Sequence, residues 1–277
     1  MTDRYAVIGN PIAQSKSPLI HTAYAQVTGH DIEYTKLLAP LGGFAAAVET
    51  FRAAGGRGMN VTAPFKLDAF AYATDLAPSA QMAGAVNALK FEGDKVHAEN
   101  FDGVGLVRDV VHNLGCPLQG RRVLILGAGG ATRGALLPIL AQRPAELWVV
   151  NRTVAKAQAL AQLAGQHQTG AVPVRGIGYA DLGTAAFDAV FNATSASLTA
   201  ELPPLPTSAF APGCLAYELA YGKGLTPFLR LAQQAGVTQL ADGVGMLAEQ
   251  AAEAFEWWRG VRPDTAAVIQ QLTVPLV

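Results

Sequence analysis

Short apolar runs of strand-like composition alternate along this chain with longer segments in which apolar residues recur at helical spacing. In the first hundred residues the pattern predicts strands at 5–9, 32–39 and 59–62, helices at 17–28 and 44–54, and a strand pair, 85–91 and 95–99, that turns at 93–94. Strands that alternate with helices are typical of α/β proteins with parallel sheets. We therefore expect an α/β fold.

A second alternating series begins after a predicted helix that opens at Asp102 and Gly103. Cys116 and Pro117 interrupt the helical pattern, and the new series runs from 122 to about 241. Two closing helices, 244–258 and 265–272, follow. Closing helices of this kind often return to the first domain. We therefore expect one domain formed by residues 1–102 and 242–277, and a second formed by residues 103–241.

Composition narrows the classes of function. The 277 residues are 51% hydrophobic, and 20 Lys and Arg against 21 Asp and Glu leave a formal charge of −1, with no basic run suited to nucleic acid or an anionic membrane. The sequence shows neither a secretory signal nor a transmembrane stretch, so we expect a cytoplasmic protein. Cys116 and Cys214 are interpreted as reduced thiols, and no histidine spacing indicates a metal site.

The segment from Val123 to Gly134 carries the clearest chemical signal, because an apolar strand passes there through clustered glycines into a helix. Glycine allows a tight turn and the close approach of a pyrophosphate to a helix N-terminus. Thr132 occupies the third glycine position of the G-x-G-x-x-G pattern, so the match is partial. The following helix and the strand at 146–150 complete a βαβ unit, which favours dinucleotide binding over a structural turn.

The residues after that strand favour NADP over NAD. An NAD enzyme usually has a carboxylate there for the ribose 2′-hydroxyl, whereas this chain has Asn151, Arg152 and Thr153, with Lys156 one turn later. Cations without a carboxylate suit a 2′-phosphate. The alternative is that Arg152 and Lys156 are solvated surface cations and that Thr153 only caps a helix.

Several polar motifs lie in otherwise apolar surroundings: GNPIAQSKSP from Gly9, NVTAPFK from Asn60, GAVN from Gly84, NFDGVG from Asn100, NATS from Asn192 and DGVGMLAEQ from Asp242. Together with the glycine turn and the NRT motif at 151–153, they resemble the shikimate dehydrogenase family in both order and spacing. The glycine turn alone is shared by many enzymes, but the whole set is specific and covers nearly the whole chain.

The resemblance implies an N-terminal α/β substrate domain, a Rossmann-type doubly wound NADP-binding domain, and a cleft between them. It implies that shikimate and 3-dehydroshikimate are interconverted by NADP-dependent hydride transfer, in the route to chorismate and the aromatic amino acids, by a monomer or homodimer. A quinate or dual quinate/shikimate dehydrogenase is the nearest alternative. A noncatalytic NADP-binding regulatory protein is a more distant one.

The resemblance also implies roles for individual residues. Ser15 and Ser17 would hold the substrate carboxylate, Tyr217 would lie near the substrate, and the ring hydroxyls would be bound by Asn60, Thr62, Asn87, Asp102 and Gln250. Neutral donors suit a polyol because each missing partner leaves a buried polar group unpaired. The cofactor would be bound by Gly127, Ala128, Gly129, Gly130, Ala131, Asn151, Arg152, Thr153, Lys156, Thr194 and Gly243.

Lys66 and Asp102 would form the catalytic pair. Oxidation of a secondary alcohol requires a base for the hydroxyl proton as well as a hydride acceptor, and Lys66 is the candidate base. We interpret Asp102 as orienting Lys66 and the hydroxyl, with the proton route left open. Taken singly, these residues are more typical of structural roles: Lys66 of a solvated lysine, Asp102 of a helix cap, Ser17 of a helix cap before Pro18 at the first helical position, and Asn60 and Asn87 of turns.

Phe101 departs from the family pattern, which has threonine between Asn100 and Asp102. A bulky ring beside the proposed catalytic carboxylate is expected to affect substrate fit and turnover.

Overall fold

A computed structural model describes residues 2–168, 170–194 and 202–276. The chain forms two compact units, Met1–Gly105 with Ala248–Gln270 and Leu106–Leu247 with Gln271–Val277. These divisions fall a few residues after the expected ones, inside helices α5 (Asp102–Arg108) and α9 (Val244–Arg259). The C-terminal residues from Gln271, expected in the first unit, group with the second because Leu276 packs against its core.

The first unit is built on a six-stranded mixed sheet in the order β2-β1-β3-β5-β6-β4. Its strands are β1 (Asp3–Gly9), β2 (Ile32–Leu38), β3 (Gly56–Val61), β4 (Asp75–Leu76), β5 (Ala88–Glu92) and β6 (Lys95–Glu99). β1 runs parallel to β2 and β3, whereas β5 is antiparallel to β3 and β6. The predicted hairpin at 93–94 is confirmed, and it is the reason that the expected parallel sheet is only partly parallel here.

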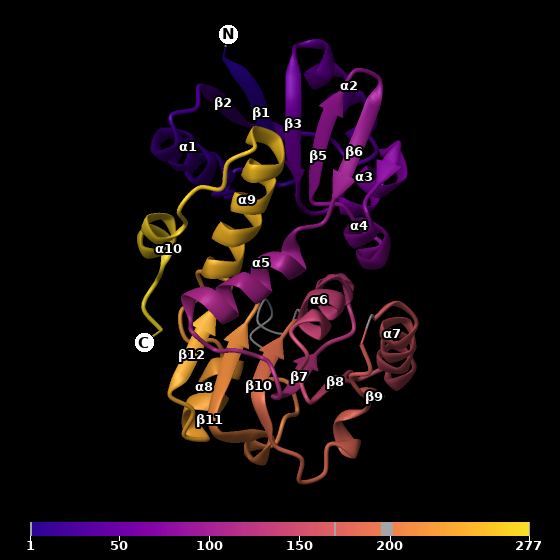
Figure 1. Ribbon diagram of the computed structural model, residues 1–277, viewed down its shortest axis with the longest axis vertical. Helices are drawn as coiled ribbons and strands as arrows, with labels where there is room; N and C mark the ends of the chain where they lie inside the picture. The colour runs from indigo at the N-terminus through magenta and orange to yellow at the C-terminus, as the bar shows by residue number, and fades with distance from the viewer. Residues whose placement is uncertain (1, 169, 195–201, 277) are drawn as a thin grey trace. The chain divides into compact units, whose positions relative to one another are not determined.

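The helices of this unit are α1 (Ser17–Thr28), α2 (Phe44–Ala53), α3 (Lys66–Tyr72), α4 (Pro78–Ala83), most of α9, and the first part of α10 (Ala266–Leu272) (Figure 1). α2 buries Phe44 and Val48 in the core beside Met59 and Phe65. The short helices α3 and α4 were not predicted, because six or seven residues are too few for a helical period to be read.

The start of α1 corrects one prediction. Ser17 was expected to cap this helix, but Lys16 occupies the N-cap position, and no side chain makes a capping hydrogen bond there. Ser17 is instead the first helical residue, next to Pro18, and its side chain is buried. Its hydroxyl is therefore available for interactions other than capping.

The second unit contains a parallel six-stranded sheet in the order β12-β11-β10-β7-β8-β9 (Figure 1). Its strands are β7 (Arg122–Leu126), β8 (Glu146–Val150), β9 (Val174–Ile177), β10 (Phe187–Asn192), β11 (Phe210–Glu218) and β12 (Gln239–Asp242), and its helices include α6 (Gly130–Ala141), α7 (Val154–His167) and α8 (Pro227–Gln234). Counted from β7, the order is 3-2-1-4-5-6, that of the doubly wound Rossmann fold. The predicted Rossmann-type architecture is confirmed.

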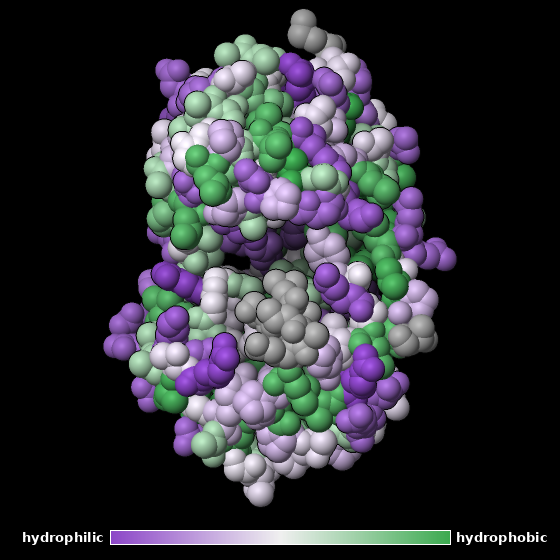
Figure 2. All heavy atoms as spheres, turned by 180° about the vertical axis from the view of Figure 1, so that it is seen from behind, coloured by the Kyte–Doolittle hydropathy of each residue, from purple (hydrophilic) through white to green (hydrophobic). Residues whose placement is uncertain are grey.

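The surface carries residues of mixed hydropathy. On the face shown in Figure 2, hydrophilic and hydrophobic residues are interspersed over both units. Exposed large apolar side chains include Leu38, Leu41 and Leu67. None of the helices in the described ranges has the length and apolarity that a membrane span requires.

Candidate active site

Lys66 and Asp102 meet in the first unit, as the sequence predicts. Lys66 is the first residue of α3, and Asp102 is the first residue of α5. The Lys66 Nζ lies 2.5 Å from Asp102 Oδ2, and the two side chains are 35% and 21% exposed, respectively. The lysine is therefore not a freely solvated side chain, and the pair remains within reach of a ligand.

Asn87 holds the other oxygen of this carboxylate. Its Nδ2 donates to Asp102 Oδ1 at 2.8 Å, and its Oδ1 accepts the backbone N–H of Phe101 at 2.9 Å. Gln250 Oε1 lies 3.5 Å from the same Nδ2. Both Asp102 oxygens are thus bound by side chains, and these bonds fix the plane of the carboxylate. Helix capping alone therefore does not explain this residue.

Asn60 joins the same set from the neighbouring strand. It lies on β3 and is 5% exposed, so it does not form a turn. Its Nδ2 donates to the backbone carbonyl of Asn87 at 3.3 Å, and its Oδ1 accepts a hydrogen bond from Tyr34 at 2.6 Å. Thr62 follows β3, and its methyl group would lie 2.6 Å from a Cβ added at Gly9, so glycine is required there.

The two serines predicted to bind a carboxylate lie together at the start of α1. Their Oγ atoms are 3.2 Å apart, and the N–H of Ser17 donates to Ser15 Oγ at 3.3 Å. Paired hydroxyls and a helix N-terminus offer neutral donors to an anion.

Tyr217 belongs to the second unit, where β11 buries it completely. Its hydroxyl donates to Asp109 Oδ2 at 2.7 Å and accepts the N–H of Met246 at 3.3 Å. Burial, with the neighbouring Asp109 carboxylate, raises the pKa of Tyr217 well above its ordinary value. The hydroxyl that was predicted to lie near the substrate is engaged within its own unit.

The glycine turn of the second unit connects β7 to α6. Gly127 has a φ of +102°, and a Cβ there would lie 3.1 Å from Thr194 Cγ2, so the turn requires glycine. Thr132 Oγ1 donates to the Gly127 carbonyl at 2.8 Å, which explains why threonine stands at the third position of the glycine pattern. Gly129 faces open space, where a ligand can approach the backbone.

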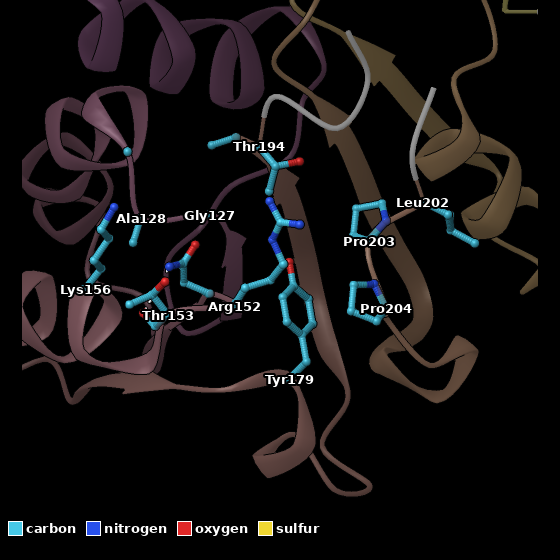
Figure 3. A pocket seen from close by; sticks show the side chains of 13 residues that line it. Gly127, Ala128, Arg152, Thr153, Lys156, Tyr179, Thr194, Leu202, Pro203 and Pro204 are labelled. Atoms are coloured by element: carbon cyan, nitrogen blue, oxygen red, sulfur yellow. Dashed lines mark hydrogen bonds between the residues drawn. The ribbon is translucent and has the colours of Figure 1, made fainter. Parts of the chain in front are cut away.

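A cavity of about 420 Å³ opens at this turn. Most of the predicted cofactor-binding residues line it: Gly127, Ala128, Gly129, Asn151, Arg152, Thr153, Lys156 and Thr194. Figure 3 shows Lys156 at one end, Leu202, Pro203 and Pro204 at the other, and Arg152 and Tyr179 between them. The sequence analysis did not predict Tyr179, Leu202, Pro203 or Pro204, because these residues lie outside the glycine turn and belong to no motif.

Three predicted cofactor-binding residues do not line this cavity. Gly130 and Ala131 form the first turn of α6, whose N-terminus lies beside the glycine turn. Gly243 follows β12 and packs against the main chain, where an added Cβ would lie 2.1 Å from the carbonyl oxygen of Leu219. Glycine at 243 is therefore required by close backbone packing.

The lining of the cavity suits a phosphorylated nucleotide. It contains the cations Arg152 and Lys156 and, among its described lining residues, no carboxylate. Thr153 occupies the N-cap position of α7 without a side-chain capping hydrogen bond, so capping does not account for it. Burial raises the pKa of Tyr179, and the nearby Arg152 opposes that rise. The glycine backbone and the two cations thus provide the donor set that a dinucleotide with an additional phosphate needs.

Thr194 is held by a buried polar cluster behind the cavity. Asn192 Oδ1 accepts from the Thr194 N–H at 3.2 Å and from its hydroxyl at 2.7 Å. Asn192 Nδ2 in turn donates to Glu218 Oε2 at 2.9 Å. The NATS motif therefore places Ala193 and Thr194 at the cavity and Asn192 in their support.

Family models match three parts of the chain. Residues 7–89 match the shikimate dehydrogenase substrate binding domain, residues 109–200 match shikimate / quinate 5-dehydrogenase, and residues 243–273 match the shikimate 5′-dehydrogenase C-terminal domain.

Individual relatives extend over the whole chain. A shikimate dehydrogenase (NADP(+)) of Aromatoleum aromaticum is 57% identical over 98% of this chain and 96% of its own. The crystal structure of an Ael1 enzyme from Pseudomonas putida superposes with a TM-score of 0.95 at 59% identity, covering 100% of both chains. That of shikimate 5-dehydrogenase from Thermus thermophilus, in complex with NADP(H) and shikimate, has a TM-score of 0.83 at 32% identity, covering 97% of this chain and 98% of that one.

Proposed function

This chain belongs to the shikimate dehydrogenase family, and we propose that it interconverts shikimate and 3-dehydroshikimate with NADP. The observation that carries the proposal is the connected set of Lys66, Asp102, Asn87 and Asn60, in which a lysine amine, a carboxylate and two amides converge. A polyol acid needs directional hydroxyl partners and a proton acceptor, and this set contains both.

The first unit binds the substrate. Ser15 and Ser17 donate to its carboxylate, while Asn60, Thr62, Asn87, Asp102 and Gln250 contact its ring hydroxyls. The hydrogen bonds among these side chains hold them in place before a ligand arrives, so little rotamer entropy is lost on binding. Tyr217 supports the second unit through Asp109 and Met246, and its contact with the substrate remains our prediction.

The proton leaves the substrate hydroxyl through Lys66 and Asp102. Asp102 holds the Lys66 amine with one oxygen and is itself oriented by Asn87 through the other. A hydroxyl placed beside this pair can pass its proton to the neutral amine of Lys66 during oxidation, and the ammonium that results can return that proton during reduction. Asp102 keeps the amine from rotating away, which is a positional contribution to catalysis.

The second unit binds NADP, which when bound supplies the hydride acceptor or donor. Ala128 and Gly129, together with the first turn of α6 at Gly130 and Ala131, would face the pyrophosphate with backbone N–H groups. Gly127 supplies the positive-φ turn, and its own N–H donates to the Val150 carbonyl at 2.8 Å. Arg152 and Lys156 hold the 2′-phosphate, and Asn151, Thr153 and Thr194 shape the rest of the cavity. Gly243 contributes by allowing β12 to pack closely on the main chain at Leu219.

We propose a cytoplasmic location and a monomeric or homodimeric state. The support for the location is chemical, since both cysteines are free thiols, as in a reducing compartment. Sedimentation of the purified protein tests the oligomeric state.

Initial-rate measurements with shikimate and NADP, beside quinate and NAD, test the proposed function. We expect turnover of shikimate with NADP to exceed every other combination. Faster turnover of quinate would reassign the substrate, and NADPH binding without turnover of either acid would leave a noncatalytic binding protein.

A further inference from the structure

Tyr34 lies between two groups of residues assigned to the substrate. It is on β2, is 8% exposed, and its hydroxyl is 2.6 Å from Asn60 Oδ1. Burial raises the pKa of Tyr34 well above its ordinary value, and the nearby Ser17 side chain opposes that rise. The Tyr34 hydroxyl therefore binds the amide assigned to a ring hydroxyl, and it lies near the serine assigned to the carboxylate.

The polarity of each hydrogen bond follows from what each atom can do. The backbone carbonyl of Asn87 can only accept, so the Asn60 group facing it at 3.3 Å is the amide nitrogen. The Asn60 oxygen then faces Tyr34, and because that oxygen can only accept, the Tyr34 hydroxyl must donate.

His21 fixes the ring of Tyr34. The two rings are stacked with centroids 4.3 Å apart and planes 5° from parallel. His21 is completely buried, and burial lowers its pKa to about 3, with Asn60 opposing the change. A neutral, flat ring thus holds the Tyr34 ring in the position from which its hydroxyl reaches Asn60.

We propose that Tyr34, supported by His21, is a positioning residue for substrate binding: its hydroxyl holds the Asn60 oxygen inward, so that Asn60 presents an N–H to the substrate. The inference rests on the proposed function, because Asn60 must contact the substrate for its orientation to matter. Without the Tyr34 hydroxyl, the Asn60 oxygen loses a buried partner and the amide is no longer held in one orientation.

Tyr34→Phe tests this inference, because it removes one oxygen and keeps the buried ring. We expect kcat/KM for shikimate to fall about tenfold, mainly through KM, while KM for NADP stays within about twofold of wild type. Tyr5→Phe is the matched control. Tyr5 lies opposite Tyr34 on β1 and is also buried, but its hydroxyl lies near Arg259, so the kinetics should stay at the wild-type level.

A double-mutant cycle distinguishes positioning from general packing. If Tyr34 acts through Asn60, Tyr34→Phe should have almost no further effect on kcat/KM in an Asn60→Ala background. Equal losses in Tyr34→Phe and Tyr5→Phe, or fully additive effects with Asn60→Ala, would overturn the inference.

His21→Leu provides an independent variant that keeps the Tyr34 hydroxyl but removes the stacked ring. We expect a rise of about two- to fivefold in KM for shikimate without a matching change for NADP. Shikimate kinetics unchanged in both Tyr34→Phe and His21→Leu would refute the positioning role. A different result would contradict the proposed function itself, namely that the wild-type protein does not turn over shikimate.

Discussion

The two units prepare their binding sites by different physical means. In the first, hydrogen bonds connect the residues assigned to the substrate: Asn60 donates to the backbone carbonyl of Asn87, whose side chain binds Asp102, which in turn binds Lys66. In the second, the cavity is formed by a glycine turn and by the exposed cations Arg152 and Lys156. One site depends on buried and partly buried side chains brought together by the fold, and the other mostly on a local stretch of backbone.

This difference predicts how each site responds to change. A buried amide or carboxylate that loses one partner leaves the other unpaired, so a single substitution in the first unit spreads through its neighbours. A solvated cation acts more independently, and salt screens its attraction for a phosphate. We therefore expect large and coupled effects in the first unit and smaller, salt-dependent effects in the second.

Lys66→Ala should have the largest effect. Loss of the base should lower kcat by about 10²- to 10⁴-fold, the usual contribution of general acid–base catalysis. NADP affinity, measured by fluorescence titration of NADPH, should change little, because the cofactor residues lie in the other unit. Lys90→Ala is the control, since Lys90 belongs to the same unit and pairs with Glu92 away from the site. Wild-type turnover in Lys66→Ala would remove Lys66 from the proton route.

His21 should make the stability of the first unit depend on pH. Its folded-state pKa of about 3 lies below the ordinary 6.5, so the unfolded chain binds the proton more readily between these values. The contribution of neutral His21 to the free energy of unfolding is therefore fully present above about pH 6.5 and is lost as the pH falls toward 3. Between about pH 7 and pH 4 the loss attributable to His21 is about 3 kcal/mol.

Urea unfolding of His21→Phe measures this loss. The variant should lose less stability than the wild type over the same pH range, because Phe cannot bind the proton. His112→Gln, at an exposed position, serves as the control and should retain the wild-type pH slope. Identical slopes for wild type and His21→Phe would mean that His21 is not the buried neutral group described above.

The same contrast explains what the sequence could predict. The glycine turn and the residues at 151–153 form contiguous motifs, so the cofactor cavity was largely predictable from local spacing. Tyr34 and His21 were not, because neither stands in a polar motif. The contact of Tyr34 with Asn60 depends on the side-by-side placement of β1, β2 and β3, and His21 reaches Tyr34 from α1. Ser17 was misassigned as a cap because Ser-Pro is also a common helix start, and only the backbone shows which residue occupies the cap.

Arg152→Ala should have a smaller effect, confined to the cofactor. Loss of a charged hydrogen bond of about 1.5–3 kcal/mol should raise KM for NADP by about 10- to 100-fold and leave KM for NAD nearly unchanged. Added salt should raise KM for NADP in the wild type more than in the variant. Arg175→Ala, at a 60% exposed cation of the same unit, should have no comparable effect. An unchanged KM for NADP in Arg152→Ala would contradict the assignment of the 2′-phosphate.

Phe101→Thr should have the smallest effect, and a mainly structural one. The Phe101 ring lies edge-to-face against Trp257, with centroids 5.7 Å apart and planes at 71°, while its backbone N–H holds Asn87 Oδ1. Threonine keeps that N–H but loses the aromatic pair, so urea unfolding should show a loss of about 1 kcal/mol, with kcat/KM for shikimate within a few-fold of wild type. The loss should be coupled to Trp257→Leu in a double-mutant cycle. A change in kcat/KM of about tenfold with stability unchanged would instead mean that the ring acts on the substrate, and that the polar network of the first unit is only part of what determines fit.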